Sequence, residues 1–98
     1  MESIELLRQR IVLAENKFAE LVLWRLTQPL TDSRHAFKYR LAYVVNGECV
    51  LRYDNEAGKG DHRHWGVKET EYTFYTPEKL LADFQHDIER WNYENSDS

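Results

Sequence analysis

The dipeptide Asn46-Gly47 constrains the fold of this chain more strongly than any other feature of the sequence. It separates residues 37–45, in which apolar and polar side chains largely alternate, from the shorter segment 49–53. Alternation with a period of two is typical of a β-strand. A two-residue type I′ turn needs positive φ at both central residues, and Asn-Gly adopts it readily. Residues 37–53 therefore predict an antiparallel hairpin.

The length of the turn also predicts which residues of the two strands face each other. Counted from the turn along a regular ladder, the predicted pairs are Val45 with Glu48, Leu41 with Arg52 and Tyr39 with Asp54. Arg52 and Asp54 are therefore expected on the same face as Leu41 and Tyr39.

A second predicted element is a C-terminal helix. Thr76 is a suitable N-cap, and Pro77 suits the first helical position. The apolar residues that follow make one stripe at three- and four-residue spacing: Leu80, Leu81, Phe84, Ile88 and Trp91. Asp83, Asp87 and Glu89 lie off this stripe, so the acidic charge is expected on the outer face of the helix.

The N-terminal third is compatible with two structures. Apolar residues between Ile4 and Leu21 fit a helix, whereas residues 9–13 and 18–26 also fit two strands around a turn at 15–17. Spacing alone does not decide between them. Residues 71–75 are rich in aromatic and β-branched side chains and predict a short strand.

The length of 98 residues corresponds to a single domain. We expect this domain to cover residues 1–91, and residues 92–98 to form a flexible acidic tail. The single cysteine, Cys49, excludes an internal disulfide and a cysteine-rich zinc site. The sequence shows no signal peptide, and no apolar run approaches the roughly 20 residues that span a bilayer. The cytoplasm is the expected location, with no membrane partner.

The net charge of −4 is unevenly distributed. Residues 34–68 carry a charge of +3, whereas residues 69–98 carry −6. Ordinary solvated charge explains such a difference, and so does a basic surface for a polyanion beside an acidic surface for another partner.

The side chains most suited to catalysis or ligand binding gather between Arg52 and Trp65. This stretch is expected to leave a strand and enter a loop punctuated by Gly58 and Gly60, and such loops let the backbone approach a ligand closely. The runs Tyr53-Asp54-Asn55-Glu56 and Gly58-Lys59-Gly60-Asp61-His62-Arg63-His64 resemble the signature of the TumE-like toxins of bacterial and archaeal toxin–antitoxin modules.

This resemblance covers about residues 5–91 and favours a hairpin in the N-terminal third. It implies a toxic activity and a DNA-binding antitoxin partner. Many such toxins cleave RNA. Without a metal, this reaction needs a base for the 2′-hydroxyl, an acid for the leaving 5′-oxygen and cations near the phosphate.

Candidates for each of these roles are present in the sequence. His62 and His64 suit the acid and base, because histidine titrates near neutral pH and two residues apart in an extended chain share a side. Asp61 or Asp54 is a candidate to orient an imidazole. The candidate cations at the phosphate are Arg40, Arg52, Lys59 and Arg63, and the candidates to stack a base are Tyr53 and Trp65.

Each role has an ordinary structural alternative. The histidines are also compatible with hydrogen-bonded loop positions, Asp54 with a turn and Trp65 with the core. Arg52 is equally able to form an ion pair with Asp54 or Asp61. His35 and His86 are assigned no site role, because neither lies in a sequence cluster. Divalent metal remains open as a cofactor, since Asp54, Asp61, His62 and His64 offer suitable ligands.

The predicted fold is α+β: an antiparallel meander of about four or five strands closed on one face by the C-terminal helix. The alternative is a helical N-terminus on a four-stranded sheet, as in RelE-like toxins. The predicted function is the toxin of a toxin–antitoxin module, a ribonuclease neutralised by a helix-turn-helix antitoxin, and a homodimer is left open. The alternatives are a non-catalytic binding module and a metal-dependent nuclease. A kinase-like activity is disfavoured, because the sequence lacks a Gly-x-x-x-x-Gly-Lys-[Ser/Thr] phosphate loop.

Overall fold

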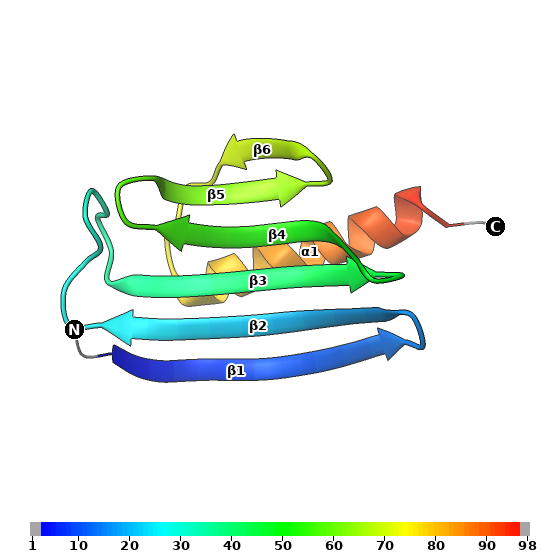
Figure 1. The fold of residues 1–98 in the computed structure, drawn as a ribbon, viewed down its shortest axis with the longest axis horizontal. Helices are drawn as coiled ribbons and strands as arrows, with labels where there is room; N and C mark the ends of the chain where they lie inside the picture. The colour runs from blue at the N-terminus through cyan, green and yellow to red at the C-terminus, as the bar shows by residue number, and fades with distance from the viewer. Residues whose placement is uncertain (1–2, 97–98) are drawn as a thin grey trace.

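The computed structural model describes residues 3–96 and has two layers, a six-stranded antiparallel sheet and one helix (Figure 1). The strands follow one another in chain order across the sheet, so every neighbouring pair is joined by a short connection. The elements are β1 (Ser3–Ala14), β2 (Lys17–Leu26), β3 (Phe37–Val45), β4 (Glu48–Glu56), β5 (Gly60–Trp65), β6 (Lys68–Glu71) and α1 (Pro77–Glu94). The predicted α+β meander is confirmed, with six strands instead of four or five.

The N-terminal third is a long hairpin and not a helix, as the family resemblance favours. β1 and β2 pair over most of their length around a turn at residues 15–16. β2 continues into β3 through the connection 27–36. The alternative of a helical N-terminus is therefore wrong.

The central hairpin forms as predicted, but its register is shifted by a bulge. Asn46 and Gly47 have φ values of 53° and 78°, as a type I′ turn requires. Beyond the turn, Val44 pairs with Cys49 whereas Tyr43 pairs with Leu51, which leaves Val50 as an extra residue in β4.

The bulge moves two predicted site residues to the opposite face, because one residue of slip reverses every side chain that follows. Arg52 pairs with Ala42, and Asp54 pairs with Arg40. The predicted pairs of Leu41 with Arg52 and Tyr39 with Asp54 are therefore wrong, and neither charged residue shares the core face.

Two further corrections concern the segments on either side of β5. The predicted glycine-rich loop is confined to residues 57–59, and Gly60–Trp65 is a strand that pairs with β4. The predicted strand at 71–75 is instead β6, which ends at Glu71, followed by an irregular connection to the helix. The His-Arg-His run therefore lies on a strand and not in a loop.

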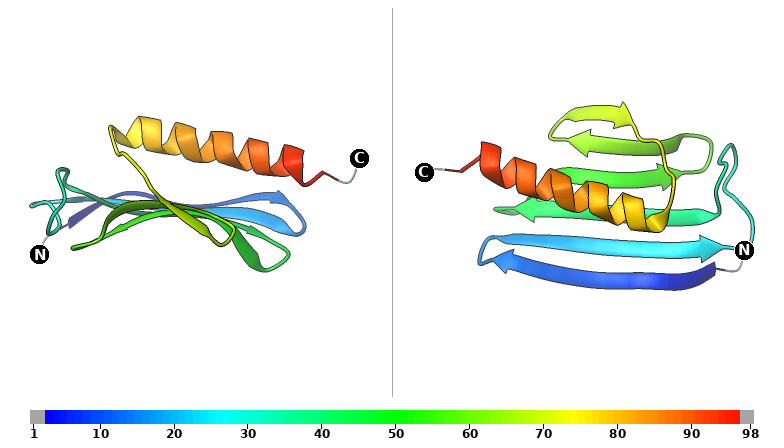
Figure 2. Two further views of the ribbon diagram at one scale, coloured as in Figure 1. Left: turned by 90° about the horizontal axis from the view of Figure 1, so that it is seen from above. Right: turned by 180° about the vertical axis from the view of Figure 1, so that it is seen from behind.

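Helix α1 crosses one face of the sheet, and its other side faces solvent (Figure 2). Thr76 caps it by accepting a hydrogen bond from the Lys79 amide at 3.1 Å, with Pro77 in the first turn, as predicted. Asp87 is buried against the sheet, so the prediction that it lies on the outer face of the helix is wrong. The helix extends to Glu94 and so includes residues 92–94, which were predicted as part of a flexible tail, and residues 97–98 of that segment lie outside the described part of the chain. No helix within residues 3–96 is long and apolar enough to cross a membrane.

The core between sheet and helix is unusually rich in tyrosine. The largest fully buried side chains are Tyr39, Tyr43, Tyr53, Leu41, Leu51, Leu80 and Asn55. Each of these tyrosine hydroxyl groups donates to a side-chain oxygen, on Asp61, Asn92 and Asp87 respectively, which offsets the cost of burying it.

Candidate functional site

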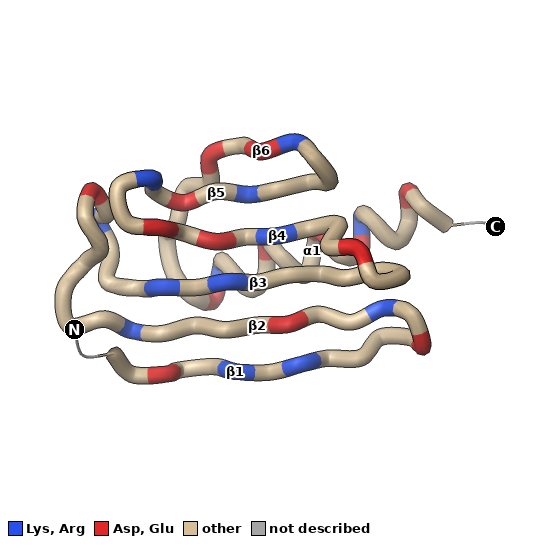
Figure 3. The backbone as a smooth tube through the Cα atoms, in the orientation of Figure 1, with Lys and Arg blue, Asp and Glu red and all other residues tan. Residues whose placement is uncertain are grey.

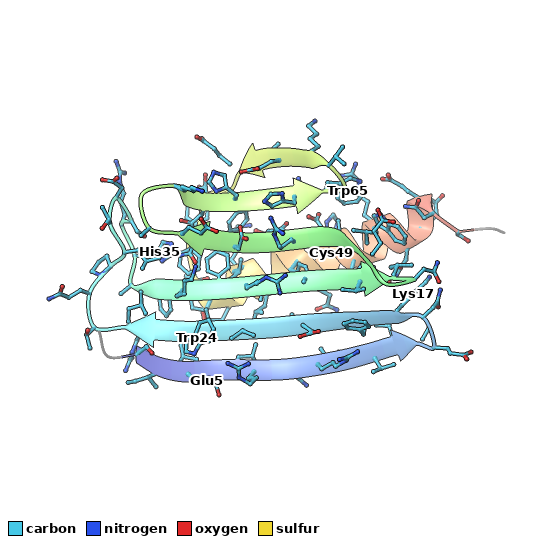
Figure 4. All side chains as sticks on the ribbon, viewed as in Figure 1. Glu5, Lys17, Trp24, His35, Cys49 and Trp65 are labelled. Carbon is cyan, nitrogen blue, oxygen red and sulfur yellow. The ribbon has the colours of Figure 1, made fainter. Side chains whose placement is uncertain are left out.

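The side of the sheet opposite α1, here called the open face, is turned toward the viewer in Figure 4. Strand pairing places most of the predicted acid, base and phosphate-binding residues on this face. Strand pairing aligns them in rows. One row runs from Arg40 through Asp54 to His62, and the next from Ala42 through Arg52 and His64 to Glu69. His62 and His64 share one face of β5, as their spacing predicts.

Glu69 and Arg52 contact the two imidazoles. Glu69 Oε1 lies 3.7 Å from His62 Nε2, and its Oε2 lies 4.0 Å from His64 Nε2. Arg52 Nη2 lies 3.2 Å from His64 Nε2. Because a guanidinium group only donates, His64 Nε2 is the acceptor in this contact. Both histidine side chains are about one-fifth exposed, at 22% and 20%, and so are accessible to a ligand.

Arg52 has donor capacity that the protein does not use. Its Nε lies 3.2 Å from Asp54 Oδ2, but the contact does not have hydrogen-bond geometry. Among the described residues, this Nε is the buried side-chain polar atom without a hydrogen bond. The Nε faces Asp54 and is closed to solvent, whereas the Arg52 side chain as a whole is 36% exposed, so an anionic ligand would reach the other nitrogens of the guanidinium.

Two adjoining hollows of about 400 and 150 Å³ make a groove across the open face. They share Arg52, Asp54 and Glu56. The other side chains that line them include Trp24, Lys38 and Arg40 at one end and Lys59, His62, His64 and Glu69 at the other. The charged residues of β3 are basic, whereas β4 carries both signs (Figure 3).

The charge of this groove is weakly positive when the histidines are neutral. Four cations, on Lys38, Arg40, Arg52 and Lys59, face three carboxylates, on Asp54, Glu56 and Glu69. Protonation of the histidines raises the positive charge further. The groove is therefore better suited to a polyanion than to a cationic ligand.

Two predicted site residues, Arg63 and Tyr53, lie on the helix side instead. Arg63 Nε donates to Asp87 Oδ2 at 2.6 Å and to the Tyr53 hydroxyl at 3.1 Å. The Asp87 hydrogen bond raises the pKa of Arg63 despite partial burial. Burial, and then hydrogen bonding to Asp87, raise the pKa of Tyr53 above its ordinary value. Tyr53 is only 2% exposed, so its ring has no free surface on which to stack a base.

Asp61 contacts a histidine that has no predicted site role. Its Oδ2 accepts from Tyr39 at 2.6 Å and lies 2.8 Å from His35 Nε2, and the His35 ring stacks on Phe74. His35 Nδ1 accepts from the Phe37 amide, so Nε2 is the nitrogen that donates to Asp61. His35, which was assigned no site role, is therefore a packed residue that holds Asp61, and the predicted role of Asp61 in orienting His62 or His64 finds no hydrogen bond among the described residues.

Trp65 also lies on the helix side of β5. Its half-buried ring is stacked by the guanidinium of Arg90 from α1, at 4.5 Å, and Arg63 approaches it at 5.6 Å. These contacts attach the end of the helix to the sheet.

The four predicted metal ligands do not converge. Asp54, His62 and His64 lie on the open face, whereas Asp61 lies on the other. Within residues 3–96, no group of three or more His, Cys, Asp or Glu side chains is arranged to hold a metal ion.

Trp24, Lys38 and Glu69 belong to the groove but were absent from the predicted site. Trp24 and Lys38 are paired across β2 and β3, and Glu69 pairs with His64. Alternation places Lys38 opposite the core-facing Tyr39, which is a signal that local pattern provides. Glu69 has no such signal, because its position depends on the turn after Trp65.

A family model described as Toxin TumE matches residues 2–92 of the chain. No curated protein and no solved structure matches the chain. The match covers nearly all of the 98 residues. The chain therefore belongs to the TumE toxin family, and this membership implies an antitoxin partner.

Proposed function

We propose that this toxin is a ribonuclease that binds RNA along the open-face groove and cleaves it at His62 and His64. The observation that carries the proposal is the position of both imidazoles on one face of β5, beside Arg52, whose side chain is 36% exposed and lines the groove. A proton acceptor, a proton donor and a cation at one phosphate are what metal-free RNA cleavage requires.

In this mechanism His64 acts as the base. Its Nε2 already accepts from Arg52, which corresponds to a neutral imidazole with its lone pair toward the groove. A phosphate that draws the Arg52 guanidinium to itself frees this lone pair to take the proton of the 2′-hydroxyl. The 2′-oxygen then attacks phosphorus, and a 2′,3′-cyclic phosphate forms.

His62 acts as the acid in the same step. Glu69 lies 3.7 Å from its Nε2 and pairs with the protonated ring. The imidazolium gives its proton to the leaving 5′-oxygen as the P–O bond breaks, so protons and charge balance between the two histidines. Arg52 and Arg40 hold the non-bridging oxygens, for which arginine has suitable geometry.

A purified-protein assay with a matched control tests this proposal. We expect His62→Ala and His64→Ala each to lower the cleavage rate of a single-stranded RNA by about 10²–10⁴-fold. His86→Ala serves as the control, because His86 is exposed on α1 away from the groove. An RNA with 2′-deoxy groups should resist cleavage, and the product should carry a cyclic phosphate.

Growth arrest on induced expression distinguishes a ribonuclease from a toxin that acts by binding alone. Arrest with RNA fragmentation that disappears in the double histidine variant, at equal protein level, supports the ribonuclease. Arrest that persists in that variant would remove the histidines from the mechanism and favour toxicity by binding alone.

The proposed antitoxin is a helix-turn-helix protein that contacts the acidic outer side of α1. Because Asp87 is buried and pairs with Arg63, charge reversal there would disturb the fold. The test therefore uses Glu78 and Glu89, which are exposed. Antitoxin binding that is unchanged by Glu78→Lys/Glu89→Lys would contradict this contact.

A further inference from the structure

The two edges of the sheet differ sharply in length and polarity. β6, at one edge, has four residues, Lys68 to Glu71, none of them apolar. β1, at the other, has 12 residues and pairs on one side only, with β2. Its exposed large apolar side chains are Ile4, Leu6, Ile11, Val12 and Leu13, with exposed fractions from 38% to 67%. Short, charged edges prevent strand addition, whereas a long apolar edge invites it.

The middle of β1 is the part that is regular enough to pair with another strand. Register shifts occur between Glu5 and Leu7 and between Val12 and Ala14, and residues 7–12 between them pair without interruption. This regular segment leaves its outer N–H and C=O groups free of sheet partners. An added strand would satisfy these groups.

The two faces of this segment would accommodate different side chains of an added strand. On the helix side, Leu7, Ile11 and Leu13 form one wall of an apolar groove of about 490 Å³, and Leu81 and Ile88 of α1 form the other. Apolar side chains on every second residue of an added strand would enter this groove.

On the open face the same segment is basic. Arg8 and Arg10 point there, beside Trp24 and Phe18 of β2, and both side chains are about 60% exposed. Arg8 forms an exposed ion pair with Glu5 at 2.6 Å, and Arg10 lies 4.0 Å from Glu20, and such exposed pairs are weak enough to be exchanged for a partner's carboxylates. Residues 7–12 contain no acidic side chain. Acidic residues on the alternate positions of an added strand would face these arginines across the strand pair.

Charge argues against a second copy of β1 as the occupant. In an antiparallel pair with two-fold symmetry, a centre at residue 8, 9 or 10 sets arginine directly opposite arginine. Like charges at directly opposed positions are destabilising. A strand of a different sequence avoids this cost.

We infer that β1 is the docking edge for an extended segment of the antitoxin in which apolar and acidic residues alternate, added to the sheet as a seventh strand. The inference rests on the proposed function only in taking the antitoxin as the partner. The contact involves the edge of the sheet that is separated from β5 by three strands, so peptide binding is measured without RNA cleavage, although Arg8 approaches Trp24 at the end of the groove.

Synthetic peptides test the chemistry of this edge. The probe is a fluorescent peptide in which leucine and valine alternate with glutamate, and a peptide of the same composition with the glutamates in one block is the control. We expect the alternating peptide to bind by fluorescence anisotropy. Arg8→Glu/Arg10→Glu should weaken binding by about tenfold or more, and Lys68→Glu at the opposite edge should leave it unchanged.

Backbone methylation distinguishes strand addition from general adhesion. Two isomers of the peptide carry N-methyl groups on the glutamates or on the apolar residues, so each blocks one edge of the added strand. One isomer should bind and the other should not. Three results would each overturn the inference. Both isomers bind equally, or no peptide binds at millimolar concentration, or the chain forms a concentration-dependent dimer that the Arg8→Glu/Arg10→Glu variant alters. Loss of RNA cleavage in the histidine variants, with peptide binding intact, keeps the two proposals separate.

Discussion

Arg52 and Arg63 come from neighbouring strands and lie on opposite faces of the sheet. Arg63 donates to Asp87 and to the Tyr53 hydroxyl, so its guanidinium is held by the helix. Arg52 contacts Asp54 and His64 on the open face, and its side chain is 36% exposed. The first arginine therefore stabilises the fold, whereas the second is free to exchange its contacts for those of a ligand.

Removal of Asp87 should destabilise the protein strongly, because it leaves Arg63 and Tyr53 without their shared acceptor. We expect Asp87→Ala to lower the free energy of unfolding by about 3 kcal/mol, measured by urea denaturation. Glu89→Ala, on the exposed side of the same helix, should change it by no more than about 0.5 kcal/mol. Equal effects of the two substitutions would argue against a role for the Asp87 network.

Trp24 should contribute to RNA affinity, because its ring lines the groove and is only partly buried, whereas the ring of Tyr39 beneath the groove is fully buried. Stacking of a base on such a ring contributes about 1–3 kcal/mol. We expect Trp24→Ala to weaken binding of a non-cleavable single-stranded RNA accordingly, and Trp24→Phe to retain most of it. Unchanged affinity in the alanine variant would place the RNA elsewhere.

At the scale of whole elements, the bulge at Val50 determines the face on which the groove is built. It places Arg52 and Asp54 on the open face, and it leaves Leu51 and Tyr53 in the core. The Val50 carbonyl also accepts a hydrogen bond from the Gly66 amide at 2.8 Å, so the bulge in β4 supports the turn between β5 and β6.

Deletion of Val50 should leave the register of the hairpin unchanged. Without Val50, a regular ladder counted from the turn pairs Tyr43 with Leu51 and Ala42 with Arg52, as in the structure, so Arg52 stays on the open face. We expect the variant to fold, with a free energy of unfolding lower by about 1 kcal/mol because the Gly66 amide loses its acceptor, as measured by urea denaturation. Gly47→Ala is the comparison in the same hairpin, because its φ of 78° is strained for alanine and should also cost about 1 kcal/mol. Loss of cooperative unfolding in the deletion variant would show that the bulge itself is needed for folding.

Local signals in the sequence were sufficient for the hairpin at Asn46-Gly47, the cap at Thr76 and the shared face of His62 and His64. Features that depend on distant partners were not predictable. Nothing near Val50 indicates a bulge, because one of its hydrogen bonds comes from Gly66. Asp87 lies off the apolar stripe by spacing, and its burial depends on Tyr53 and Arg63 in the sheet.

At the scale of the whole molecule, tyrosine hydroxyl groups connect the helix to the sheet and to the segment before it. Tyr43 donates to Asn92, Tyr53 to Asp87 and Tyr72 to Asp83. These contacts extend along much of α1. Each needs a protonated tyrosine, so the docking of the helix depends on pH.

Alkaline pH should therefore unfold the protein. Burial, followed by the hydrogen bonds to carboxylates, raises the pKa values of Tyr53 and Tyr72 above their ordinary value. The stability that results is fully present below the unfolded-state pKa of about 10 and is lost as pH rises above it. We expect tyrosinate absorbance and the loss of helical circular dichroism to rise together. Tyrosinate formation in Tyr53 and Tyr72 while the helix stays intact would contradict this coupling.

The sequential order of the strands has a consequence for how the chain acquires its structure. Each strand pairs with the one synthesised before it, so the contact order is low for a β-rich protein and the sheet is able to assemble progressively. Helix α1 is made after every strand, and the tyrosine-rich side of the sheet stays uncovered until then. During synthesis the nascent sheet is therefore the aggregation-prone species, and Asp87 reaches Arg63 only after the helix has left the ribosome.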